Sequence, residues 1–211
     1  MRQNSSRLVG RLVATVLIML VTGGCSLVTT YFGFQDIPVE DLQADYANSE
    51  SEFIPVNEMM VHVRDEGSGP VLVLLHGTLA SLHTWDGWVP VLSRDYRIIR
   101  MDLPGFGLTG LPGNGSGHFS LELVKDTVLK ILAERNVNKA TFIGNSFGGE
   151  VSWRLAVEYP ELVERVVLID AKSFPQKWPF VLNLVRRPPL RTFSSFTIPR
   201  YSVAIGLYQV Y

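Results

Sequence analysis

Gly144-Asn145-Ser146-Phe147-Gly148 lies between an apolar run, Ala140 to Ile143, and an amphipathic run, Glu150 to Tyr159. The first run predicts a buried strand, and the second predicts a helix that ends before Pro160. A tight turn from strand to helix exposes the hydroxyl of Ser146, and the glycines on either side leave room for that turn. The pattern makes Ser146 a candidate nucleophile. The alternative is a glycine-rich loop that contains a serine by chance.

Two further predicted strands end in loops that contain candidate site residues. Val71 to Leu75 leads into His76-Gly77-Thr78, and Tyr96 to Met101 leads into Asp102-Leu103-Pro104-Gly105-Phe106-Gly107. The continuous apolar run of Val71 to Leu75 is typical of a parallel strand that is buried on both faces. Open α/β sheets carry their sites at the carboxyl ends of such strands. We therefore expect the backbone N–H groups of Thr78 and Phe147 to stabilise an oxyanion beside Ser146.

These motifs together resemble the α/β-hydrolase superfamily, in the branch of meta-cleavage-product hydrolases, epoxide hydrolases and haloalkane dehalogenases. The resemblance rests on five segments of the chain: His76-Gly77-Thr78, Trp85, Asp102 to Gly107, Gly144 to Gly149, and Leu168-Ile169-Asp170. It implies an α/β fold, a mostly parallel sheet of eight strands with helices on both faces and a helical cap after the sixth strand. Because Ser146 stands where dehalogenases and epoxide hydrolases of this branch carry aspartate, it also implies hydrolysis of an ester, a lactone or a ketone-adjacent C–C bond through an acyl-serine.

The resemblance also implies a chain order of nucleophile, acid and histidine. All four histidines precede Ser146 here, namely His62, His76, His83 and His118. The sixth strand is expected at Val163 to Ile169, and residues 172–211 are expected to begin the cap. The last strands and the catalytic histidine are then missing, so we expect the chain to be a fragment.

Three other polar residues near these motifs have competing interpretations. Asp170 follows the sixth strand, where some dehalogenases of this branch place the catalytic acid, so it is a weak candidate acid; a structural or capping role is favoured. His76 is expected to orient the loop beside Ser146 through hydrogen bonds to backbone. Asp102 is expected to fix the turn at Pro104-Gly105 rather than to take part in chemistry.

The composition fits a globular enzyme core. Hydrophobic residues make up 46% and charged residues 18% of the 211 residues. A net charge of −1 lacks the excess of positive charge that is typical of a nucleic-acid-binding protein. No phosphate-binding loop or metal-ligand cluster is visible in the sequence, so we expect no cofactor and a small-molecule substrate. The single cysteine excludes an internal disulfide.

The N-terminal residues have the pattern of a targeting segment. Arginines precede an apolar stretch from Leu12 to Val21, and no acidic residue occurs before Asp36. Residues 1–25 therefore predict a signal peptide or an N-terminal membrane anchor. Small residues before Cys25 resemble a lipoprotein cleavage site; the alternative is an uncleaved anchor that extends through Val28. In either case we expect the protein to be attached to a membrane of the cell envelope.

The domain organisation follows from these assignments. Residues 26–52 are expected to form a tether, with a short helix at Val39 to Tyr46, and residues 53–171 the hydrolase core. An amphipathic helix is expected at Ser120 to Arg135, where five apolar residues fall on one face. Two function classes remain open at this stage: a serine hydrolase, and a non-catalytic binding module or decayed gene product of the same fold.

Overall fold

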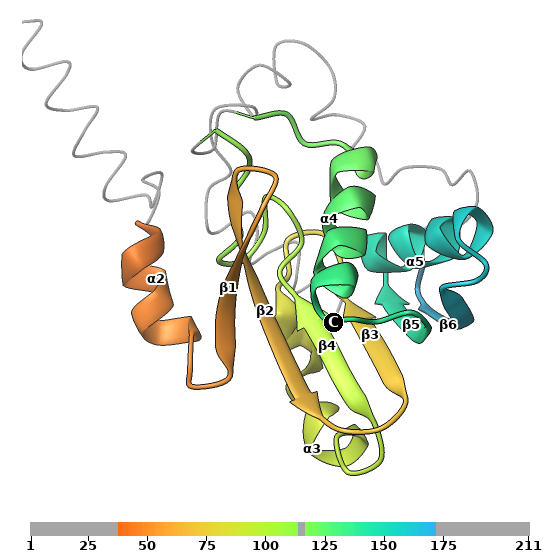
Figure 1. The fold of residues 1–211 in the computed structure, drawn as a ribbon. Coiled ribbons are helices and arrows are strands. Elements are labelled where there is room, and N and C mark those ends of the chain that lie inside the picture. The colour runs from red at the N-terminus through yellow and green to blue at the C-terminus, as the bar shows by residue number, and fades with distance from the viewer. Residues whose placement is uncertain (1–37, 114–116, 172–211) are drawn as a thin grey trace, which may run out of the picture. The chain divides into compact units, whose positions relative to one another are not determined.

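The computed structural model describes residues 38–113 and 117–171. A mixed six-stranded sheet forms its centre, in the order β1-β2-β4-β3-β5-β6 (Figure 1). The strands are β1 (Ser51–Val56), β2 (Met59–Gly67), β3 (Val71–Leu75), β4 (Arg97–Met101), β5 (Ala140–Asn145) and β6 (Val163–Ile169). The β1–β2 and β2–β4 pairs are antiparallel, and β4, β3, β5 and β6 run parallel to one another.

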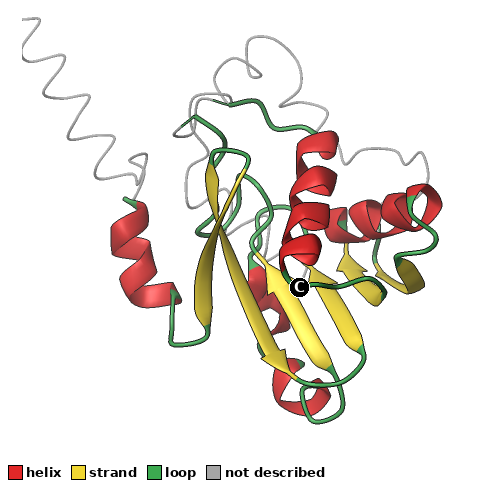
Figure 2. Cartoon of the chain, in the orientation of Figure 1, coloured by secondary structure: helices red, strands yellow, loops and turns green. Residues whose placement is uncertain are grey.

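Helical segments accompany the sheet, as Figure 2 shows. They are α2 (Val39–Tyr46), the 3₁₀ turn η1 (Leu82–Trp85), α3 (Val89–Leu92), α4 (Leu121–Glu134) and α5 (Phe147–Glu158). Side chains of β3 alternate between two separate cores: Val73 and Leu75 pack with α4 and α5, whereas Leu72 and Leu74 pack with Trp85 and Val89. This alternation places helices on both faces of the sheet, because successive residues of a strand point to opposite sides.

The predicted fold class is confirmed, since the described residues form the expected mostly parallel sheet with helices on both faces. The predictions for 71–75, 163–169 and 39–46 coincide with β3, β6 and α2. Other predictions differ in their bounds: β1 begins at Ser51, before the expected core, and α5 begins at Phe147 instead of Glu150. The bounds of β4, β5 and α4 differ from the predicted ones by one or two residues. The early start of α5 goes against the low helix propensity of Gly148 and Gly149, and packing against the sheet compensates for it.

The predictions for residues 1–37 lie outside the described residues. These are the signal peptide or anchor, Cys25 and the first part of the tether, residues 26–37. The expected cap at 172–211 also lies outside them. Among the helices of residues 38–113 and 117–171, none has the length and apolar character needed to cross a membrane.

Candidate active site

Ser146 occupies the turn between β5 and α5 in a strained backbone conformation. Its φ of 50° and ψ of −110° lie where residues other than glycine are rarely found. Two hydrogen bonds hold the turn: the Ser146 N–H donates to the Ile169 carbonyl at 2.9 Å, and the Glu150 N–H donates to the Ser146 carbonyl at 3.1 Å. Strain of this kind costs roughly 1–3 kcal/mol and is typical of functional sites. The side chain is partly exposed at the carboxyl edge of the sheet.

Glycines at 144 and 148 make this turn sterically possible. A Cβ on Gly144 would lie 2.3 Å from the Gly148 carbonyl oxygen. A Cβ on Gly148 would lie 2.2 Å from the Leu75 carbonyl oxygen and 2.6 Å from that of His76. Both distances are far below van der Waals contact with backbone atoms, which cannot move aside easily. The two glycines therefore let the start of α5 approach the end of β3.

The His76-Gly77-Thr78 loop lies directly against this turn. Leu75 pairs with Gly144 in the parallel β3–β5 register, so the loop leaves the sheet beside the serine. A Cβ on Gly77 would be 3.1 Å from the Ser146 Cβ. Within the part of the chain that the structure describes, the N–H groups of Thr78 and Phe147 donate to no protein acceptor. Both amides are thus available to a ligand atom.

His76 is buried beneath the loop and is bonded to backbone on both sides. Its Nδ1 lies 2.7 Å from the Gly77 carbonyl, and its Nε2 accepts from the Leu103 N–H at 3.0 Å. These partners require a neutral ring protonated on Nδ1. Burial lowers the pKa of His76, although the bond to Gly77 partly opposes that shift. His76 therefore holds the Gly77 loop to the loop after β4, as its predicted orienting role requires.

Asp102, at the end of β4, connects three segments of the chain through its carboxylate. Its carboxylate accepts from the Leu82 N–H at 2.7 Å, the Leu108 N–H at 2.8 Å and the ring of His62 at 2.8 Å. Burial alone raises the pKa of this carboxyl, but the hydrogen bonds from His62, Leu82 and Leu108 outweigh it, and the net pKa is lowered. Asp102 is therefore an ionised group that fixes loops, and its contacts extend the predicted turn-fixing role.

A further hydrogen bond connects the His62–Asp102 pair to Ser51 of β1. The His62 Nε2 lies 2.8 Å from the Ser51 Oγ, which gives a chain of Ser51, His62 and Asp102. The Ser51 Oγ also accepts from Arg64 Nε at 3.1 Å and from the Asn48 N–H at 3.2 Å. These donors occupy the lone pairs of the Ser51 oxygen. Ser51 therefore has a structural role, in which it connects β1 with β2 and, through His62, with the end of β4.

The remaining histidines do not approach Ser146. In η1, His83 contacts the Asp86 carboxylate at 2.8 Å and the Tyr46 carbonyl at 3.0 Å, and His118 is exposed in the loop before α4. Across residues 38–113 and 117–171, no hydrogen bond joins a histidine to Ser146. Asp170 is exposed at the end of β6 with a φ of 46°. The structure therefore brings Ser146, Gly77 and Phe147 together, and within the residues it describes no histidine is hydrogen-bonded to the serine.

Three phenylalanines beside Ser146 were not identified from the sequence as a cluster. The Phe106 and Phe119 rings are 5.8 Å apart, and Phe119 is 5.7 Å from Phe147. Phe106 also meets His76 edge-on at 5.7 Å. The rings come from the loop after β4, the residue before the N-cap of α4 and the first turn of α5, and only tertiary contact brings them together. Phe119 is 46% exposed, so the cluster presents an apolar surface next to the serine.

No metal site accompanies this arrangement in the described residues, where no group of three His, Cys, Asp or Glu side chains could hold an ion. The groups that can act chemically are a serine hydroxyl and two backbone donors.

Comparison with known proteins places this geometry in a family. The family profile described as alpha/beta hydrolase fold matches residues 70–197. The chain is 36% identical over 109 residues to the pimeloyl-[acyl-carrier protein] methyl ester esterase of Nitrosomonas europaea, covering 52% of this chain and 40% of that protein. It is 31% identical over 119 residues to the 2-hydroxymuconate semialdehyde hydrolase of a Pseudomonas species, covering 54% and 41%.

A solved structure agrees with these matches. The meta-cleavage product hydrolase of Pseudomonas fluorescens superposes with a TM-score of 0.59 at 31% identity, over 65% of this chain and 52% of that one. The chain spans about two fifths of the length of the two curated relatives. The profile match covers more than half of the chain and includes the Ser146 turn, the Gly77 loop and the loop after β4. This chain belongs to the α/β-hydrolase family.

Proposed function

We propose that this chain carries the nucleophile and the oxyanion site of a serine hydrolase. The strained conformation of Ser146, pressed against Gly77 at the carboxyl edge of the sheet, is the observation that carries the proposal. A serine used only as a structural N-cap adopts ordinary extended backbone, as Ser120 does before α4 with a φ of −146°. The strained turn at Ser146 leaves its side chain partly exposed.

In this mechanism the Ser146 Oγ attacks a carbonyl carbon while its proton passes to a base. The carbonyl oxygen becomes an oxyanion, and the N–H groups of Phe147 and Thr78 donate to it. Collapse of the intermediate expels the leaving group and leaves an acyl-serine, which water hydrolyses to regenerate the hydroxyl. Each oxyanion donor is worth roughly 10²–10³ in rate.

The substrate that we propose is an ester, a lactone or a C–C bond next to a ketone. Two relatives support this range by their names, one a methyl ester esterase and the other a semialdehyde hydrolase. The apolar surface of Phe106, Phe119 and Phe147 beside the serine fits an organic acyl group.

The base of this mechanism comes from outside the described residues, because none of the four histidines makes a hydrogen bond to Ser146 among them. We therefore expect the 211-residue chain to show little turnover by itself. Binding and the oxyanion site alone still give roughly 10³–10⁴-fold catalysis over water when triad residues are removed.

Labelling with a fluorophosphonate, followed by peptide mass spectrometry, tests the nucleophile. We expect slow modification at Ser146 that free imidazole accelerates, because imidazole supplies the absent base. Ser146→Ala should abolish this modification. Ser120→Ala should retain it and serves as the matched control, since Ser120 is also an N-cap serine. Equal labelling of the Ser146→Ala chain, or none with imidazole, would count against the proposal.

A non-catalytic binding role is the second candidate, and it is favoured because no histidine is hydrogen-bonded to Ser146 among the described residues. Fast labelling of Ser146 without imidazole would exclude this second role, and it would mean that one of the four upstream histidines or another group serves as the base.

A further inference from the structure

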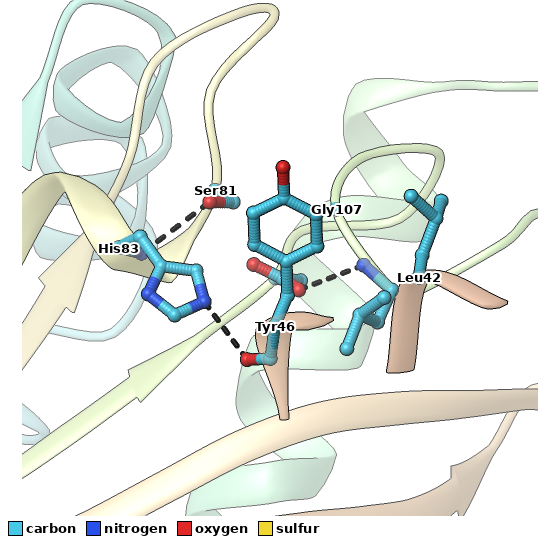
Figure 3. Close-up of a pocket in the computed structure, with 7 residues that line it drawn as sticks. Leu42, Tyr46, Ser81, His83 and Gly107 are labelled. Atoms are coloured by element: carbon cyan, nitrogen blue, oxygen red, sulfur yellow. Dashed lines mark hydrogen bonds between the residues drawn. The ribbon is translucent and has the colours of Figure 1, made fainter. Parts of the chain in front are cut away.

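A half-open cavity of about 160 Å³ lies between α2, η1 and the loop after β4 (Figure 3). Leu42 and Tyr46 of α2 form one wall, and Ser81 and His83 form another. Gly107 and Leu108 of the loop after β4 line the cavity as well. Figure 3 shows the Tyr46 ring standing between His83 and Leu42.

This cavity is separate from the Ser146 site, although both use the loop after β4. Phe106 of that loop packs against His76 and Phe147, on the side of the serine. The next two residues, Gly107 and Leu108, line the cavity. The wall formed by α2 lies outside residues 70–197, which the family profile matches.

The charges of the cavity wall disfavour an anionic ligand. Asp102 contributes an ionised carboxylate, and all of its hydrogen-bonding partners come from the protein. Both ring nitrogens of His83 are engaged, one with Asp86 and the other with the Tyr46 carbonyl. His83 therefore offers the cavity its ring carbons and no free nitrogen.

The Ser81 hydroxyl is a polar group of the wall that remains available to a ligand. The Ser81 Oγ accepts from the His83 N–H at 3.4 Å. Its proton has no acceptor among the described residues, so it can donate to a bound molecule. Most of the remaining wall surface is apolar.

We propose that this cavity binds one uncharged, ring-sized molecule that carries a single hydrogen-bond acceptor, of the phenol class. The volume fits a six-membered ring, since apolar protein cavities of about 150 Å³ bind benzene. The ring lies between Leu42 and Leu108, and its oxygen accepts from the Ser81 hydroxyl. This site does not depend on the proposed catalytic role of Ser146.

Fluorine NMR of 4-fluorophenol with the full chain tests the proposal. We expect saturable binding with a dissociation constant on the order of 1 mM, which is typical of a ligand of this size. The anionic analogue 4-fluorobenzoate should bind at least tenfold more weakly, because the Asp102 carboxylate lies in the wall.

Two tryptophan variants on α2 locate the bound molecule. Leu42→Trp fills the cavity and should abolish binding, whereas Val39→Trp adds the same ring at an exposed position of the same helix and should leave binding unchanged. Both residues are outside the buried core, so circular dichroism should show both variants folded. Absence of saturable binding to the wild-type chain would overturn the proposal. So would undiminished binding to Leu42→Trp, or equal binding of 4-fluorobenzoate.

Discussion

At the scale of single residues, the candidate site depends on backbone geometry more than on side-chain chemistry. Ser146 adopts a φ that side chains rarely allow, and the glycines around it accept contacts that no other residue could make. The strain is maintained because β3 and β6 hold the turn on both sides, through the contacts of Gly148 and the hydrogen bond to Ile169. A single Cβ in the wrong place should therefore break the site.

Gly148→Ala tests this dependence. The added methyl group would lie 2.2 Å from the Leu75 carbonyl oxygen, a backbone atom of a central strand. Overpacking typically costs 1–3 kcal/mol, so we expect a loss of about 3 kcal/mol or more in the free energy of unfolding, measured by urea denaturation. Gly87→Ala is the matched control, because nothing lies within 4 Å of its Cβ position. Similar losses in the two variants would contradict the steric account.

At the scale of elements, α2 is attached to the core chiefly by its carboxyl end. No residue of α2 is buried. Its last carbonyl, that of Tyr46, accepts from Arg64 Nη2 at 2.9 Å and from His83 Nε2 at 3.0 Å. Donor groups at the carboxyl end of a helix also interact favourably with the negative end of the helix dipole. The element that covers the cavity is therefore held by a few polar contacts.

Arg64→Met should loosen α2 and leave the sheet intact. Methionine fills the buried space of the arginine stem but cannot donate to the Tyr46 carbonyl or the Ser51 Oγ. Losing charged hydrogen bonds costs roughly 1.5–3 kcal/mol each, so amide exchange of residues 39–46 should accelerate about tenfold or more by mass spectrometry. Arg97→Met makes the same change on β4 away from α2, and it should leave that exchange unaltered. Unchanged exchange in Arg64→Met would show that packing alone holds the helix.

At the scale of the whole molecule, His76 links stability to pH. Its pKa in the folded state is lowered by burial below the ordinary value of about 6.5. The folded state therefore binds fewer protons, and stability falls as pH drops below about 6.5. Each pKa unit of difference between the folded and unfolded states is worth about 1.4 kcal/mol. The pKa values of Asp86, Asp102 and Asp126 are lowered as well, and these three groups reduce the stability only in a more acidic range, below about pH 4.

Urea denaturation between pH 8 and pH 5 measures this linkage. We expect the wild-type chain to lose stability across the interval and His76→Asn to lose less, because the asparagine amide keeps a donor for the Gly77 carbonyl and does not titrate. His118→Asn removes an exposed histidine and should follow the wild-type slope. A parallel slope for His76→Asn would show that another group titrates.

The local patterns of the sequence determined the elements and the nucleophile candidate. The apolar run at 71–75, the helical spacing at 120–135 and the glycines around Ser146 are each local patterns, and each predicted its element. The bounds of α5 were missed because its first turn contains two glycines, whose low propensity is compensated only by packing against β3.

The tertiary structure alone decided which distant residues meet. His62 and Asp102 are 40 residues apart, and Leu82 and Asp102 are 20 apart; they meet because the order β2-β4-β3 brings the ends of β2 and β4 and the chain beyond β3 together. The cluster of Phe106, Phe119 and Phe147 and the cavity under α2 arise in the same way. The sequence by itself specifies the turn at Ser146, because steric limits on a turn are local. The surroundings of that serine depend on strand order, which no single stretch of the chain encodes.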